Sequence, residues 1–231
     1  MKKLIVTIAA LALSLGAFAQ INFGVKVGGN LANISGMVGE DANSNVNFGG
    51  TQIFGTDASQ SMKFGFNAGV FAEYMVMPML GIQVEANFST QGVNTAGSLE
   101  VLDNVTNRKV VYAANYVNVP ILAKLHLGPI RVYAGPQLGF ATGFNTKTTT
   151  VNSKTPDKED ISKAVVENYN SFDFSLALGA QYKLTENIGV DARYNIGLTN
   201  VFPAVKNDKG EVTADAWGKQ GVVQLGVFYE F

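Results

Sequence analysis

The stretch that decides the fold is the last one, Gly221-Val-Val-Gln-Leu-Gly-Val-Phe-Tyr-Glu-Phe231. Apolar side chains stand at every second position back from the final residue, at Val223, Leu225, Val227, Tyr229 and Phe231. Successive side chains of a β-strand point to opposite faces. The alternation therefore predicts a strand with one apolar face, which ends on an aromatic carboxy terminus.

The same alternation recurs in seven earlier stretches of the chain. These stretches are Ile21–Leu31, Phe64–Tyr74, Leu80–Ser89, Tyr116–His126, Arg131–Phe140, Phe172–Leu184 and Ile188–Leu198. Alternation over this length is the signal of a strand with one buried or lipid-facing side. The sequence therefore predicts an all-β fold of eight strands, with ten strands as the alternative count.

The connections between these stretches alternate between very short and long. The short ones are Met75–Met79, Leu127–Ile130 and Thr185–Asn187, and the long, polar ones are Asn33–Ser61, Gly92–Lys109, Asn145–Asn168 and Asn200–Trp217. Transmembrane barrels place short turns on the periplasmic side and long loops outside the cell. The order predicts an antiparallel up-and-down barrel with both termini on the side of the short turns. Within the third long segment, Ile161–Glu167 is expected to form one or two helical turns.

The first nineteen residues have the layout of a secretory signal. Lys2 and Lys3 form a basic tip, an apolar stretch too short to cross a bilayer follows, and Ala17-Phe-Ala19 is a small-residue cleavage site. We expect a signal peptide over residues 1–19 and one barrel domain over 20–231, with a buried helix or an uncleaved anchor as the alternatives. The chain has no cysteine, which excludes disulfides and lipidation on cysteine.

The composition excludes some classes of function. Charged residues make up 15% of the chain, below the roughly 25% of ordinary soluble domains, and glycine occurs 25 times. The formal net charge is -1, so no basic excess points to a nucleic-acid partner.

The polar faces of the predicted strands share a set of charged residues interspersed with glycines. They are Lys26, Glu73, Glu85, Lys124, Arg131, Asp173, Lys183, Asp191, Arg193 and Glu230. A solvent-exposed face would carry more Lys and Glu and fewer glycines, whereas glycine suits a narrow barrel interior. The polar face is therefore predicted to point inward and the apolar face to contact lipid; a lipocalin-like soluble barrel, with these faces reversed, is the alternative.

Charges inside a barrel must be paired, because burial of an unpaired charge costs several kcal/mol. We expect a salt-bridge network in the periplasmic half of a side-chain-filled interior, with a charged ion pathway as the alternative. Proline lacks the N–H that a strand ladder needs, so bulges are expected near Pro120 and Pro136.

Two features resemble known proteins. The terminal strand ending in Phe231 resembles the insertion signal that bacterial barrel-assembly machinery recognises. Asn115-Tyr-Val-Asn-Val-Pro-Ile-Leu-Ala-Lys124 and Gly128-Pro-Ile-Arg-Val-Tyr-Ala-Gly-Pro136 are similar to the signatures of the PorT-like outer-membrane β-barrel family, which often has Glu where this chain has Asn118. The resemblance implies a transmembrane barrel among the lipids of the cell outer membrane, and it implies no reaction.

The sequence offers no constellation for catalysis, a metal or a cofactor. The single histidine, His126, is expected to join the interior polar network beside a short turn, away from the outer rim. Phe202 and Trp217 are expected to anchor the last long loop at the lipid interface, with a ligand platform as the alternative. We therefore expect a structural or interaction protein whose long loops contact an extracellular or membrane-protein partner. The alternatives are a narrow channel or transporter for a small or apolar solute, and a barrel enzyme.

Overall fold

The computed structural model describes residues 21–35, 47–48, 51–52, 56–101, 104–152, 155–166, 169–206 and 212–231. The expected signal peptide lies outside these residues. Within the described part of the chain, no helix combines the length and the apolar character needed to cross a membrane.

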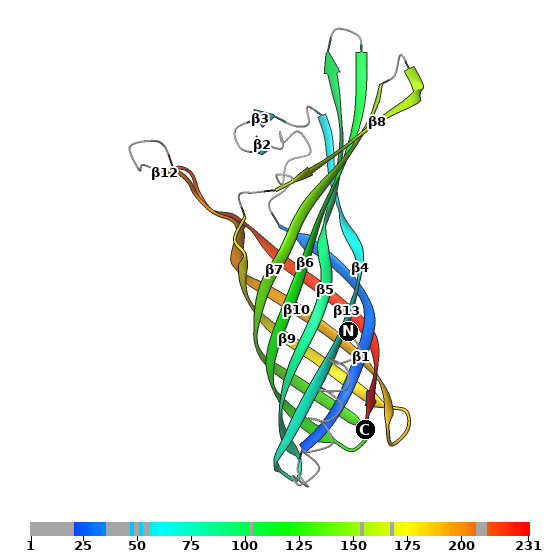
Figure 1. Cartoon of the computed structure of the whole chain (residues 1–231), viewed down its shortest axis with the longest axis vertical. Helices are drawn as coiled ribbons and strands as arrows, with labels where there is room; N and C mark the ends of the chain where they lie inside the picture. Colours follow the sequence, from blue (N-terminus) through cyan, green and yellow to red (C-terminus); the bar gives the residue numbers. More distant parts are fainter. Residues whose placement is uncertain are drawn as a thin grey trace, which may run out of the picture.

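Eight long antiparallel strands form a closed ring (Figure 1). In ring order they are β1 (Ile21–Ile34), β4 (Thr56–Met77), β5 (Leu80–Val101), β6 (Asn104–Leu127), β7 (Ile130–Asn152), β9 (Phe172–Lys183), β10 (Ile188–Phe202) and β13 (Trp217–Glu230). The terminal strand β13 closes the ring on β1 in a continuous register from Gly24↔Glu230 to Ile34↔Gln220. Closure pairs both edges of the sheet, and the prediction of an eight-stranded up-and-down barrel is confirmed.

The exposed and buried residues alternate as the sequence predicts. Leu225, Val227 and Tyr229 are 61%, 47% and 42% exposed, whereas Gln224 and Glu230 on the other face are buried. Exposed aromatic residues lie near the ends of the apolar faces, at Tyr74, Phe140, Phe172, Tyr182, Tyr229 and Phe231. An apolar outer band bordered by aromatic residues is the surface of a transmembrane barrel. The lipocalin-like alternative, which needs these side chains inside, is wrong.

Strands β4 to β7 extend far beyond the barrel (Figure 1). They contain 22, 22, 24 and 23 residues, against 12 in β9, and about 9–11 residues are enough to cross a bilayer. We call their outer parts, residues 56–61, 94–101, 104–113 and 145–152, together with β8 (Thr155–Val165), the projecting sheet. Two small ladders complete the strands: β2 (Asn47–Phe48) with β3 (Thr51–Gln52), and β11 (Val205–Lys206) with β12 (Val212–Ala214).

Two expectations for the long connections are wrong. Residues 92–109 are not a loose segment, because β5 and β6 stay paired from Gly92↔Ala113 to Val101↔Asn104. Ile161 and the residues up to Val165 form no helix and instead belong to β8, which pairs with residues 145–152 of β7; Glu167 lies outside the described residues. In both places a long-range ladder overrides the weak local preference of polar residues, as tertiary pairing commonly does.

The bulges expected at the prolines are also absent from the described ladders. The register between β6 and β7 is the same at Pro120↔Gln137 and at Ala123↔Ala134, and Pro136 pairs with Leu176 of β9 without a shift. In this register Pro136 lies opposite the residue after Pro120. The two positions that lack a backbone N–H donor are therefore neighbours, and the strands keep the same register on both sides of them. The register of these two strands shifts at Asn115/Tyr116 instead.

Candidate functional site

The lower half of the barrel, near the short turns, contains a layer of paired charges. At its centre is Glu85 of β5, which is 1% exposed. Its Oε2 lies 3.1 Å from Lys26 Nζ, and the Arg193 guanidinium donates two bonds of 2.9 and 2.6 Å to its two oxygens. The amides of Gln83 and Asn87 donate to the same carboxylate. A bidentate arginine and a lysine thus compensate the charge of a carboxylate that is buried away from solvent.

A second group of paired charges lies closer to the turn between β6 and β7. Lys124 Nζ is 3.0 Å from Glu73 Oε2, and His126 Nε2 is 2.5 Å from Glu73 Oε1. Lys124 also donates to the amide oxygens of Gln83 and Gln181. The prediction that His126 belongs to the interior polar network is confirmed.

The terminal strand contributes the third group. Glu230 accepts from Arg131, with one of the two bonds at 3.2 Å, and its Oε2 is 2.8 Å from Lys183 Nζ. Because β13 pairs with β1 to close the ring, this carboxylate links the closing strand to Arg131 of β7 and Lys183 of β9. The terminal residues therefore hold the interior together as well as closing the sheet.

Asp191, Tyr133 and Gln181 connect the first two groups. Tyr133 donates a 2.8 Å bond to Asp191 Oδ2, and Arg193 Nε donates to the Tyr133 hydroxyl at 3.0 Å. The Arg193 guanidinium also lies 5.0 Å from the centre of the Tyr133 ring. Gln181 donates to Asp191 at 2.8 Å. The predicted salt-bridge network in the half of the barrel near the short turns is confirmed.

Three inward aromatic rings lie against glycines, an arrangement that sequence reasoning missed. In each case the glycine is the register partner of the aromatic residue: Gly24↔Phe71, Gly189↔Phe228 and Gly179↔Tyr133. A Cβ atom built on any of the three glycines would lie 2.2–2.4 Å from the ring that covers it. The glycines therefore make room for aromatic rings inside a narrow barrel. Their place on the polar faces was visible in the sequence, but their partners depend on register.

Above the charged layer, the inward positions carry amides and hydroxyls. Asn30 donates to Ser89 Oγ at 2.8 Å, and Asn67 donates to Asn30 Oδ1 at 2.5 Å. Both polar atoms of the Asn195 side chain, together with Asn87 Oδ1 and Gln91 Oε1, are buried without a hydrogen-bond partner. Inward polar side chains thus continue above the charged layer, and several of their polar atoms have no partner among the described residues.

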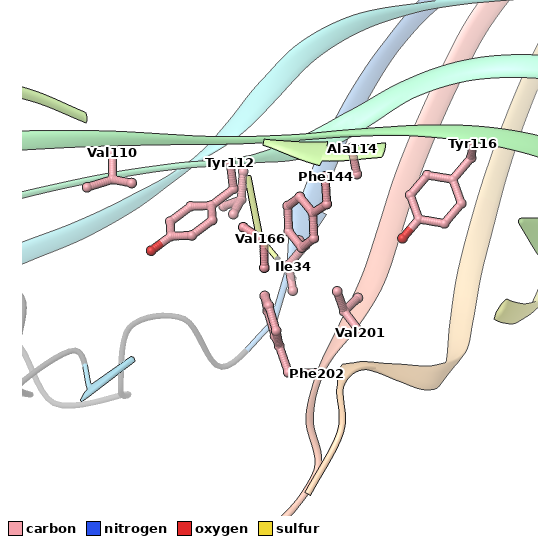
Figure 2. Packing of buried hydrophobic residues seen from close by; sticks show 10 residues of the cluster. Ile34, Val110, Tyr112, Ala114, Tyr116, Phe144, Val166, Val201 and Phe202 are labelled. Carbon is pink, nitrogen blue, oxygen red and sulfur yellow. The ribbon is translucent and has the colours of Figure 1, made fainter. Parts of the chain in front are cut away.

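A cluster of buried hydrophobic side chains, which we call the aromatic plug, packs between the strands at the end of the barrel opposite the short turns (Figure 2). Its members are Ile34, Val93, Val110, Tyr112, Ala114, Tyr116, Phe144, Val166, Val201 and Phe202, with Ala141, Tyr169 and Trp217 packed against them. The rings of Phe202 and Trp217 stack with centres 4.3 Å apart, and Phe144 stacks on Phe202 at 5.7 Å.

Phe202 and Trp217 were expected to anchor at the lipid interface. This expectation is wrong, because both rings pack in the aromatic plug. Phe202 is only 4% exposed and packs inside the mouth. Strict alternation from Leu198 would place it on the outer face, but the register of β10 against β13 shifts between Ile196 and Asn200. Such a shift re-aims the side chains that follow it, and no sequence signal marks it.

The interior is thus built as charges, amides and aromatic rings in succession from the short turns to the mouth. Among the described residues, no three or more His, Asp or Glu side chains gather as metal ligands would. The chemistry of the interior is that of a packed and paired core, and the absence of catalytic, cofactor-binding and metal-binding residues stays a prediction.

Comparison with known proteins agrees with this architecture. A family model described as an outer membrane protein β-barrel domain matches residues 18–203. None of the curated sequences compared with the chain matches it. Among solved structures, it is similar to the attachment invasion locus protein Ail of Yersinia pestis, with 13% identity, a TM-score of 0.38, and coverage of 92% of this chain and 98% of Ail.

Two further solved barrels are similar at the same level. Neisserial surface protein A has 12% identity and a TM-score of 0.34, with coverage of 91% of this chain and 97% of that protein. The N-terminal barrel domain of Pseudomonas aeruginosa OprF has 14% identity and a TM-score of 0.34, with coverage of 90% and 97%. At these TM-scores the assignment rests on the family model, whose match spans most of the chain. The chain belongs to the family of outer-membrane protein β-barrel domains.

Proposed function

We propose that this outer-membrane barrel is a structural and interaction protein, in which the filled barrel fixes the projecting sheet at the cell surface. The observation that carries the proposal is the length of β4 to β7, each 22–24 residues. About half of that length crosses the bilayer. The rest pairs with β8 in the projecting sheet, which lies beyond the apolar band. The exposed residues of this sheet can contact a partner outside the cell.

We further propose that the chain is a PorT-like outer-membrane barrel, and two sequence motifs support this assignment. The two matching motifs form the paired strands β6 and β7, and Lys124 of the first motif holds Glu73 in the charged layer. We also propose that the barrel-assembly machinery recognises β13, since its apolar face ends on Phe231, which is 76% exposed and packs edge-on against Tyr229 at 5.5 Å.

A narrow channel or transporter for a small or apolar solute is the second candidate. The aromatic plug favours it, because it offers an apolar surface inside an otherwise polar lumen. The charged layer argues against passage: a solute would have to separate Glu85 from Lys26 and Arg193, and exposing one buried charge without its partner costs about 3–5 kcal/mol.

Single-cysteine labelling tests the orientation on which the interaction role depends. The natural chain has no cysteine, so each variant carries one reactive thiol. Asn107 is exposed on the projecting sheet and Glu186 is exposed in the turn between β9 and β10. We expect Asn107→Cys to react with a membrane-impermeant maleimide on intact cells, and Glu186→Cys to react only after the outer membrane is permeabilised. Labelling of Glu186→Cys alone on intact cells would place the projecting sheet on the periplasmic side and refute the proposal.

A further inference from the structure

Two lysines face each other on the outer surface of the projecting sheet. Lys147 of β7 and Lys163 of β8 are direct register partners, and Lys109 of β6, which pairs with Thr149, lies diagonally across from Lys147. All three lysines are exposed. Like charges directly opposite on an antiparallel sheet repel and destabilise the pairing. An anion bound between them would remove this repulsion.

Lys147 and Lys163 both line an open surface pocket of about 400 Å³. Its lining residues are Val111, Ala113, Asn145, Thr146, Lys147, Lys163, Ala164 and Val165. The lining contains no carboxylate, and among the described residues none of the nearby lysines, Lys109 included, forms an ion pair. Within the described part of the chain, the pocket therefore combines two lysines that have no ion-pair partner, an amide side chain and apolar side chains.

The height of the pocket indicates which anion can reach it. The outer face of β7 carries Phe140 in the aromatic border of the apolar band and Lys147 seven residues further out. With about 3.3 Å per residue and a tilt of about 40°, Lys147 lies roughly 18 Å above that border. Phospholipid headgroups add only about 5–8 Å on each side of the hydrocarbon core. A phosphate at the height of the pocket must therefore be carried on a larger headgroup, such as a saccharide.

We propose that this pocket binds a phosphate group on the saccharide of an anionic glycolipid in the outer leaflet beside the barrel. Lys147 and Lys163 contact the phosphate as compact point charges, Asn145 offers hydrogen bonds to sugar hydroxyls, and Val111 and Val165 cover the apolar face of the ring. The proposal rests on the proposed function, because it requires the projecting sheet to lie outside the cell.

The test uses the full-length protein in neutral detergent, titrated with rough-form lipopolysaccharide that has a phosphorylated core. We expect the double variant Lys147→Gln/Lys163→Gln to raise the Kd at least about tenfold, since it removes two charge-assisted contacts. Lys219→Gln is the matched control, because Lys219 is an exposed lysine on β13, and it should leave the Kd unchanged. Wild-type binding should also weaken in 0.5 M NaCl, where charges are screened.

Chemically dephosphorylated lipopolysaccharide and phosphatidylglycerol distinguish the ligand chemistry, and both are expected to bind the wild type at least about tenfold more weakly. The proposal would be overturned if the wild type bound either of these ligands as tightly as the phosphorylated lipopolysaccharide, or if the double variant bound as tightly as the wild type. Displacement of the lipopolysaccharide by polyglutamate at equal charge concentration would also overturn it, and would assign the pocket to an acidic protein partner. The gel shift of each variant on heating confirms that its barrel is folded. If Asn107→Cys is labelled on intact cells but no glycolipid binds, only this inference fails, whereas inverted labelling rejects both proposals.

Discussion

Replacing Glu85 with glutamine is expected to lower the free energy of unfolding by about 3–5 kcal/mol. The substitution keeps the volume of the side chain but removes the negative charge that Lys26 and Arg193 share at 2.6–3.1 Å. Both cations are buried, and neither can reach water without opening the barrel. Asp191, 3.9 Å from Lys26, is too distant to replace the lost carboxylate.

Urea unfolding in lipid vesicles, followed by the loss of the folded band on unheated gels, measures this change. Glu186→Gln is the matched control, since Glu186 is exposed in a short turn and its replacement should change stability by no more than about 0.5 kcal/mol. If Glu85→Gln behaved like this control, the charged layer would not be a determinant of stability.

Replacing Gly179 with valine is expected to destabilise the barrel by about 3 kcal/mol. A Cβ atom on Gly179 would lie 2.4 Å from Cζ and the hydroxyl of Tyr133 and 2.6 Å from the backbone oxygen of Ala192. The Tyr133 ring would have to move, and its hydrogen bonds with Asp191 and Arg193 would be lost. Valine is itself a good strand residue, so poor strand propensity cannot explain the loss.

Gly143→Val separates the steric effect from the general effect of a larger side chain. A Cβ atom at Gly143 meets no heavy atom within 4 Å, so this variant should unfold at nearly the wild-type urea concentration. The same vesicle assay compares the two variants. Similar midpoints for both would mean that the contact between glycine and aromatic ring does not constrain the interior.

The two-residue alternation was enough to predict the barrel, because a closed sheet in lipid needs an apolar residue at every second position of every strand. It failed where the sheet leaves the membrane. Residues 92–109 are mostly polar or small and show little apolar alternation, so their pairing appears only in the register of β5 with β6. The inward position of Phe202 could not be predicted either, because the register shift after Ile196 interrupts the alternation and no residue in the sequence marks it.

For the interior, the sequence predicted which residues are charged and buried, but not which partners they have. Glu85 and Arg193 are 108 positions apart in the chain, and their contact depends on the register of all the strands between them. The aromatic plug was missed because Phe202 and Trp217 fall in an expected connection, and Tyr112 and Phe144 lie outside the predicted strands. Composition and alternation therefore define the layers, whereas the contacts within each layer require the closed ring.

The central claim is that the charged layer and the aromatic plug close the lumen, so that the protein acts through its outer surface. Single-channel recording of the full-length protein in planar lipid bilayers tests it most directly. We expect inserted protein, verified as folded by its shift on heating, to give no steady conductance above the baseline of the bilayer. A large, steady conductance from most inserted molecules would contradict a closed interior and favour the channel.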